Sequence, residues 1–140
     1  YASFRPRYPA ALFAWLASAT RGHERAWDCG TGSGQAAVGL AAHYEAVVAT
    51  DPSLSQLSSA ERARGVEYVA MSAEASALRA ESMDLVTVAQ ALHWFDREGF
   101  FAEVDRVLRL GGVLAVWSYG LLAQSWLRAL RWIRNLPETA

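Results

Sequence analysis

The sequence predicts an α/β fold with one doubly wound, mostly parallel sheet of five strands and helices on both faces. Short apolar runs alternate with helical patterns over most of the chain. The run at 84–89 is nearly continuously apolar, as expected of a central parallel strand that is buried on both faces. A glycine-rich turn joins the first predicted strand to the helix that follows. With 140 residues, 53% of them hydrophobic, the chain has the size of one domain and can bury a core.

The predicted elements alternate along the chain. Pro9 can occupy the first turn of a helix that runs to about Thr20. Three further helices are expected at about 34–43, 54–63 and 97–109. The five strands are expected at about 25–29, 47–50, 67–71, 84–89 and 113–117. This pattern divides a single domain of residues 1–140 into an N-terminal lead and helix (1–22), a core (23–120) and a C-terminal segment (121–140).

The C-terminal segment predicts an amphipathic helix over 121–134. Leu122, Trp126, Leu130 and Ile133 share one helical face, and arginines lie opposite. A helix packed on the sheet is favoured over a membrane or partner helix. No strand signal follows Trp117, so the fifth strand is expected to be an open apolar edge. The last helix, a second copy of the chain, or sequence outside the chain would then cover that edge.

Composition excludes several classes of function. The net charge is −1 and no basic block is present, which argues against a nucleic-acid partner. Cys29 is the only cysteine, so no intrachain disulfide can form, and a buried filler role is favoured over a nucleophile. No metal site is predicted. Without a signal peptide or membrane-spanning run, the sequence favours a cytoplasmic protein with no membrane partner.

The rest of the chain is organised around residues 26–35, which read Ala-Trp-Asp-Cys-Gly-Thr-Gly-Ser-Gly-Gln. Glycine at alternate positions lets the backbone turn sharply and leaves no Cβ between the backbone and a ligand. The helix that follows directs its first N–H groups at whatever lies over the turn. The stretch therefore predicts a strand–turn–helix nucleotide site, with an empty structural turn as the alternative.

Two kinds of nucleotide site compete for this stretch. The dinucleotide fingerprint G-x-G-x-x-G requires glycine where Gln35 stands, and an acid about 20 residues later. Here the third glycine comes one position early and Asp28 precedes all three. The series D-x-G-x-G-x-G resembles the first motif of class I S-adenosylmethionine (SAM) methyltransferases. An acid suits the ammonium and sulfonium of SAM, whereas it would repel a pyrophosphate, so NAD binding is disfavoured.

Two further stretches resemble one branch of that family. The lead Y-x-x-F-R-P-x-Y-P at 1–9 and the string H-W-F-D at 93–96 are similar to small-molecule methyltransferases of the trans-aconitate methyltransferase-like kind (methyltransferase type 11). The resemblance covers roughly residues 1–120. It implies a Rossmann-like sheet of order 3-2-1-4-5 with SAM as cofactor. The β6–β7 hairpin usual in that family is expected to be missing, as in a C-terminally truncated member.

The resemblance also implies the residues that bind SAM. Asp28, Gly30, Gly32 and Gly34 would hold the methionyl part, and Asp51 the ribose. Pro52 and Ser53 would border the adenine, with Ser72, Ala73 and Glu74 at its edge. Ser72 departs from the aspartate usual in relatives. Turn formation or helix capping by Asp51, and a solvated helix-start role for Glu74, are the alternatives.

The substrate side is assigned in the same way. Tyr1, Arg5 and Tyr8 would be lid residues; the alternative is a lead-in to the first helix whose aromatic side chains pack on the sheet. Trp94, after the strand at 84–89, would face the substrate at the switch point of the sheet. Gln90 and His93 would lie between cofactor and acceptor, His93 as a general base or orienting donor. The alternative is a loop histidine that bonds backbone, with Trp94 and Phe95 in the core.

These observations together favour a SAM-dependent methyltransferase that acts on a small-molecule acceptor. The alternatives are a non-catalytic or incomplete SAM-binding domain and, less favoured, an NAD-binding Rossmann domain. A homodimer through the open edge of the fifth strand, or through the C-terminal helix, is a further expectation.

Overall fold

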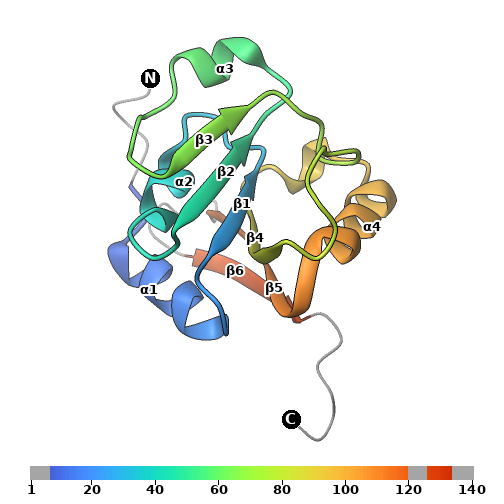
Figure 1. Cartoon of the computed structure of the whole chain (residues 1–140). Helices are drawn as coiled ribbons and strands as arrows, with labels where there is room; N and C mark the ends of the chain where they lie inside the picture. Colours follow the sequence, from blue (N-terminus) through green and yellow to red (C-terminus); the bar gives the residue numbers. More distant parts are fainter. Residues whose placement is uncertain (1–6, 120–125, 134–140) are drawn as a thin grey trace, which may run out of the picture.

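The computed structural model describes residues 7–119 and 126–133, which form one six-stranded sheet with helices on both faces (Figure 1). The strand order is β3-β2-β1-β4-β5-β6, and neighbours from β3 through β5 pair in parallel. The strands are β1 (Arg25–Cys29), β2 (Ala46–Thr50), β3 (Val66–Val69), β4 (Met83–Ala89), β5 (Leu108–Tyr119) and β6 (Trp126–Ile133). The predicted doubly wound α/β sheet of order 3-2-1-4-5 is therefore confirmed.

The helices lie between the strands and are shorter than predicted. They are α1 (Ala10–Ala19), α2 (Gln35–Leu40), α3 (Leu54–Ser58) and α4 (Arg97–Val107), with a 3-10 turn η2 (Leu92–Trp94) after β4. The helix expected at 54–63 ends at Ser58 because the chain then turns back to the glycine-rich turn, where Glu61 N donates to Ser33 O at 2.9 Å. Tertiary contacts, which local helix propensity does not register, set this end.

The prediction for the C-terminal segment is wrong in the part that the structure describes. Trp126–Ile133 form strand β6, not a helix, and pair antiparallel with β5, so that Val113 lies opposite Ile133 and Trp117 opposite Ala129. Backbone hydrogen bonds to an otherwise unpaired edge outweigh the helical spacing of the apolar residues. The predicted open edge of β5 is therefore occupied, and the dimer expected through that edge or a C-terminal helix loses its basis. Residues 121–125 and 134–140 of that prediction lie outside the described residues.

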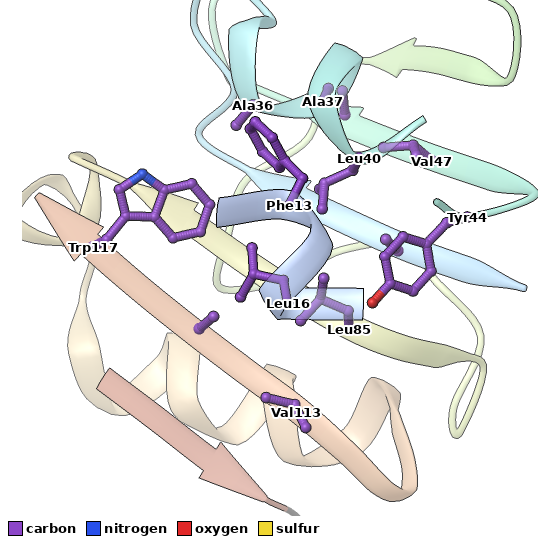
Figure 2. Close-up of a cluster of buried hydrophobic side chains, with 13 residues drawn as sticks. Phe13, Leu16, Ala36, Ala37, Leu40, Tyr44, Val47, Leu85, Val113 and Trp117 are labelled. Atoms are coloured by element: carbon purple, nitrogen blue, oxygen red, sulfur yellow. The ribbon is translucent and has the colours of Figure 1, made fainter. Parts of the chain in front are cut away.

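Two apolar layers cover the two faces of the sheet. Helices α1 and α2 lie on one face, where Phe13 and Leu16 pack on side chains of β1, β2, β4 and β5 (Figures 1 and 2). Helix α4 lies on the opposite face, where Phe100 and Val104 pack beside Trp27. Burial on both sides explains why β4 is apolar along almost its whole length.

A buried carboxylate fixes the amino end of the central strands. Asp84 Oδ2, at the start of β4, accepts hydrogen bonds from the backbone N–H of Glu24 and Arg25 at 3.0 Å each. Arg109 on β5 donates to the same carboxylate at 3.1 Å. One side chain thus connects the amino ends of β1, β4 and β5.

Candidate functional site

The candidate site lies where the chain changes direction across the sheet. From β1 the chain proceeds to β2 and β3 on one side, and then returns to β4 on the other side of β1. In parallel α/β sheets, ligands bind at the carboxyl ends of the strands at such a switch point. Asp28 near the end of β1, Asp51 after β2 and Gln90 after β4 are brought to this edge, with the glycine-rich turn between them.

Asp28 is buried within the wall of this site, with 1% of its surface exposed. Its Oδ2 accepts a hydrogen bond from Thr31 Oγ1 of the turn at 2.6 Å. Its Oδ1 accepts one from Thr87 Oγ1 on β4 at 2.7 Å. Burial raises the pKa of Asp28 to about 6, while the two hydroxyl bonds lower it and the charge of Asp51 adds to the rise. The predicted contact of Asp28 with a cofactor stays a prediction. In the structure its carboxylate links Thr31 of the turn to Thr87 on β4.

The three glycines of the turn all have positive φ, but for different steric reasons. A Cβ on Gly30 would lie 2.7 Å from the Cβ of Ala91, and one on Gly34 would lie 2.2 Å from the hydroxyl of Tyr68. A Cβ on Gly32 would meet nothing within 4 Å. Gly30 and Gly34 are therefore required by the packing of the protein itself. Only Gly32 of the three leaves its backbone open to an approaching ligand.

Asp51 is joined directly to this turn. Its Oδ2 accepts a hydrogen bond from the backbone N–H of Gly32 at 3.1 Å, and its Oδ1 accepts one from Ser53 N at 2.9 Å. The second bond is a turn of the kind aspartate often forms with its own backbone. The N-cap of α3 is Ser53, not Asp51. The structure thus places the predicted ribose-binding acid at Gly32, with Pro52 exposed and Ser53 half-buried beside it.

The residues predicted for the adenine edge have internal partners. Ser72 Oγ accepts a hydrogen bond from Ala75 N at 3.2 Å, and Ala73 is buried. Glu74 Oε2 accepts one from Asp96 N at 2.9 Å, so this acid holds the start of α4 instead of lying free in solvent. An adenine contact for the three residues remains a prediction.

Gln90 has a strained backbone at the end of β4. Its φ of 62° lies in the left-handed region, which side chains other than glycine adopt only at a cost of about 1–2 kcal/mol. Its N–H donates to Trp117 O at 2.8 Å, and its Nε2 donates to the hydroxyl of Tyr8 at 2.9 Å. Strain at a switch point, held by specific bonds, is a common property of functional positions.

Tyr8 connects the N-terminal lead to the site. Its backbone N–H donates to Gln35 Oε1 in the first turn of α2 at 2.6 Å, and Arg7 pairs with Glu61. The lead thus lies across the start of α2 and the end of β4. Tyr1 and Arg5, the other predicted lid residues, lie outside the described residues.

Trp117 on β5 is a candidate that the sequence interpretation missed. It is 1% exposed, and its Nε1 has no hydrogen-bond acceptor among the residues that the structure describes. The ring of Tyr8 packs edge-on against it, with centroids 5.7 Å apart. By contrast, Nε1 of the equally buried Trp27 donates to Thr50 Oγ1 at 2.8 Å. The sequence signal was a tryptophan at the end of an apolar strand, which is also typical of simple core packing.

The H-W-F-D string forms the turn after β4. Leu92–Trp94 make the 3-10 turn η2, and the Trp94 side chain is 79% exposed, which contradicts the alternative that places it in the core. Phe95 packs on Phe100 at a centroid separation of 4.9 Å. The side chain of His93 lies outside what the structure describes, so its catalytic role stays a prediction.

Two other kinds of site are not found in the described part of the chain. Within residues 7–119 and 126–133, no group of three or more histidine, cysteine, aspartate or glutamate side chains could hold a metal ion. None of the helices in these ranges is both long and apolar enough to span a bilayer.

Comparisons with known proteins agree with this geometry. A methyltransferase homologue of Dictyostelium discoideum is 43% identical over 123 residues, which cover 87% of this chain and 47% of that protein. Yeast CRG1, named an S-adenosylmethionine-dependent methyltransferase, is 31% identical over 85% of this chain and 44% of its own length. A solved structure from Anaeromyxobacter dehalogenans, assigned as a type II methyltransferase, superposes with a TM-score of 0.81 at 48% identity, over 84% of this chain and 50% of that one.

The chain spans about half the length of these relatives. The family model described as a methyltransferase domain matches residues 27–116. The match begins in β1 at Trp27, beside the buried Asp28, and ends within β5. The chain therefore belongs to the family of methyltransferase domains.

Proposed function

We propose that this chain binds SAM at the glycine-rich turn and forms the cofactor-binding part of a methyltransferase that acts on a small molecule. The observation that carries the proposal is the bond between Asp51 and Gly32. It joins a carboxylate suited to a ribose to the one glycine of the turn whose backbone is sterically open. The similarity to the yeast protein named for SAM supports the choice of cofactor.

The residues present fit this cofactor. Each carboxylate oxygen of Asp51 accepts one hydrogen bond from the protein and retains a further lone pair, so the side chain can also accept from ribose hydroxyls. The open side of Gly32 gives room for the ligand. Pro52 and Ser53 lie next to Asp51 and would border the adenine, with Ser72, Ala73 and Glu74 beyond them.

Charge favours a cationic adenosine ligand over a dinucleotide. The charge of Asp51 contributes to the raised pKa of Asp28, so the two carboxylates repel each other across the turn. A ligand with an ammonium and a sulfonium would relieve that repulsion, whereas a pyrophosphate would increase it. Asp28 would act on the ligand mainly through its negative charge, because Thr31 and Thr87 already donate hydrogen bonds to both of its carboxylate oxygens.

When bound, the cofactor would supply an electrophilic methyl group: an acceptor oxygen, nitrogen or carbon would bond to the methyl carbon in line as the carbon–sulfur bond breaks, with S-adenosylhomocysteine as the leaving group. The protein then contributes mainly position and exclusion of water. Gln90, whose amide is fixed by Tyr8, would lie between cofactor and acceptor. His93 would serve as a base for a hydroxyl or carbon acid. A carboxylate acceptor needs no such base, so His93→Ala should then have little effect.

Calorimetric titration with S-adenosylhomocysteine and with NAD tests the cofactor. We expect binding of the first only, and we expect Asp51→Asn to weaken it by about tenfold, the effect of one charge-assisted hydrogen bond. Glu67→Gln, an acid-to-amide change at an exposed position on β3, is the matched control and should leave the affinity unchanged. Tighter binding of NAD, or equal effects of both variants, would overturn the proposal.

A methyl-transfer screen with labelled SAM tests the activity. Small phenols, carboxylates and amides are offered as acceptors to the full chain. Turnover of one of them supports an enzyme. Binding of S-adenosylhomocysteine without any turnover would favour a non-catalytic or incomplete SAM-binding domain.

A further inference from the structure

The unpartnered indole N–H of Trp117 points to a ligand contact. Nε1 of tryptophan can only donate a hydrogen bond, and buried donors without an acceptor are rare because they lose their bond to water and gain none in return. Trp117 is such a donor among the described residues. In Figure 2 the nitrogen lies on the side of the ring away from Phe13 and Leu16, so the core packs on the carbon side of the indole.

The position of Trp117 in the sheet relates it to the proposed cofactor site. Asp28 pairs with Thr87 on β4, and Thr87 pairs with Ala115 on β5. Ala115 and Trp117 are two residues apart, so their side chains lie on the same face of the sheet as those of Asp28 and Thr87. Two strand spacings, about 10 Å, separate β5 from β1. Trp117 thus lies across β4 from the glycine-rich turn, near the carboxyl end of β5 and at the edge of the sheet that holds the candidate site.

The described groups that contact the Trp117 indole or its backbone are uncharged. Tyr8 packs on its ring, and Gln90 bonds both the Tyr8 hydroxyl and the backbone of Trp117. Arg7, the neighbour of Tyr8, pairs with Glu61. Among the described residues no counter-charge contacts the indole, so an anion bound there would be buried at a cost that a neutral oxygen, which gains the same hydrogen bond, does not incur.

We infer that Trp117 determines acceptor specificity: its indole N–H binds an uncharged oxygen, such as an amide or ketone carbonyl, on the methyl acceptor. This inference rests on the proposed function. Because Nε1 is buried, the ligand reaches it when the half-buried Tyr8 ring moves. That movement breaks the bond from Gln90 to Tyr8, so binding of the acceptor also frees the Gln90 amide for contact with the ligand.

Nuclear magnetic resonance of the 15N-labelled full chain tests the contact directly. The chain has six tryptophans, and the indole N–H signals of Trp117 and Trp27 are assigned on the unmodified chain from through-bond and nuclear Overhauser spectra. The chain is saturated with S-adenosylhomocysteine, and benzamide or benzoate is then added. These probes share a ring but carry a neutral carbonyl or a carboxylate.

We expect benzamide to move the Trp117 proton downfield and to slow its exchange with deuterium, with a smaller effect of benzoate. The signal of Trp27, which is already bonded to Thr50, should not move. Trp117→Phe should weaken benzamide binding by about tenfold, the effect of one hydrogen bond, and Trp27→Phe should not. The spectrum of the unmodified chain decides the question even where a variant fails to fold.

Three outcomes would overturn the inference while the proposed function stands. The first is a Trp117 signal that stays fixed with both probes although S-adenosylhomocysteine binds. The second is a larger effect of benzoate than of benzamide. The third is a downfield shift produced by S-adenosylhomocysteine alone, so that the donor meets the cofactor and not the acceptor. Failure of S-adenosylhomocysteine to bind would instead contradict the proposed function, and with it this inference.

Discussion

The carboxylate of Asp51 accepts a hydrogen bond from the backbone N–H of Gly32 at 3.1 Å, although 19 residues separate them in the chain. Parallel pairing of β1 and β2 brings the two positions to the same edge, with Cys29 opposite Thr50. Thr31 N also donates to Thr50 O at 2.8 Å. The turn after β1 is therefore shaped partly by the end of β2, and substitutions in either segment should alter the proposed ligand site.

Alanine at Gly32 should separate binding from folding. The added Cβ meets nothing within 4 Å, so we expect a loss of stability of only about 1–2 kcal/mol from the positive φ. The same Cβ enters the space proposed for the ligand, so affinity for S-adenosylhomocysteine should fall by tenfold or more. Thermal unfolding and calorimetry measure the two effects.

Gly34→Ala is the comparison for that variant, because its Cβ would lie 2.2 Å from the Tyr68 hydroxyl. We expect it to lower the melting temperature clearly more than Gly32→Ala does. Equal losses of stability in the two variants, with affinity unchanged in Gly32→Ala, would contradict a ligand site at Gly32.

Ionisation of Asp28 should reduce stability as pH rises. The pKa of Asp28 is about 6 in the folded chain, against an ordinary value of 3.8 for an aspartate in water, so the folded state binds this proton more tightly than the unfolded state does. Its contribution to stability is complete below about pH 4 and is lost as pH rises through about 6. The difference corresponds to about 3 kcal/mol.

The Asp28→Asn variant lacks this titration. Between pH 4 and pH 7, the free energy of unfolding of the unchanged chain should fall by about 2 kcal/mol relative to that of the variant, measured by urea denaturation. Parallel pH profiles for the two proteins would show that Asp28 titrates normally. Weaker S-adenosylhomocysteine binding by the variant at pH 7 would fit the proposed electrostatic role.

Glycine at position 90 should relieve backbone strain at the expense of function. Gln90→Gly removes the side chain from a φ of 62° and should leave the free energy of unfolding unchanged or raised by about 1 kcal/mol. It also removes the amide that bonds Tyr8, so kcat/KM in the methyl-transfer assay should fall.

Glu81→Gly is the matched variant, since Glu81 has a φ of 52° in the segment before β4, at the other end of that strand from Gln90. We expect a similar change in stability with full activity. A loss of activity as large as that of Gln90→Gly would mean that backbone flexibility, and not the amide, accounts for the effect.

Asp84→Ala should destabilise the sheet. The change leaves the backbone N–H groups of Glu24 and Arg25 without their acceptor and Arg109 without its buried partner. We expect a loss of about 3 kcal/mol in urea denaturation, whereas Glu67→Ala on the exposed side of β3 should change stability by less than about 0.5 kcal/mol. A similarly small loss of stability in the Asp84→Ala and Glu67→Ala variants would show that the amino ends of the strands are held by packing alone.

The sequence predicted the strands around the glycine turn because their signals are local. Alternate glycines at 30, 32 and 34, an acid at the end of each of the first two strands and short apolar runs each reflect the conformation of a few neighbouring residues. Strand β6 was missed because Trp126–Ile133 have helical spacing, and only the unpaired edge of β5 favours the strand.

By itself, then, the sequence determined the alternation of strands and helices, the position of the turn and its likeness to methyltransferases, and that likeness implied the sheet order. Only the tertiary structure decided which glycine is open and that Glu74 accepts a bond at the start of α4. It also decided that Trp117 has no acceptor within residues 7–119 and 126–133, where Trp27 has one. The reason is physical: backbone conformation depends on adjacent residues, whereas the surroundings of a side chain depend on segments that are distant in the chain and meet only on folding.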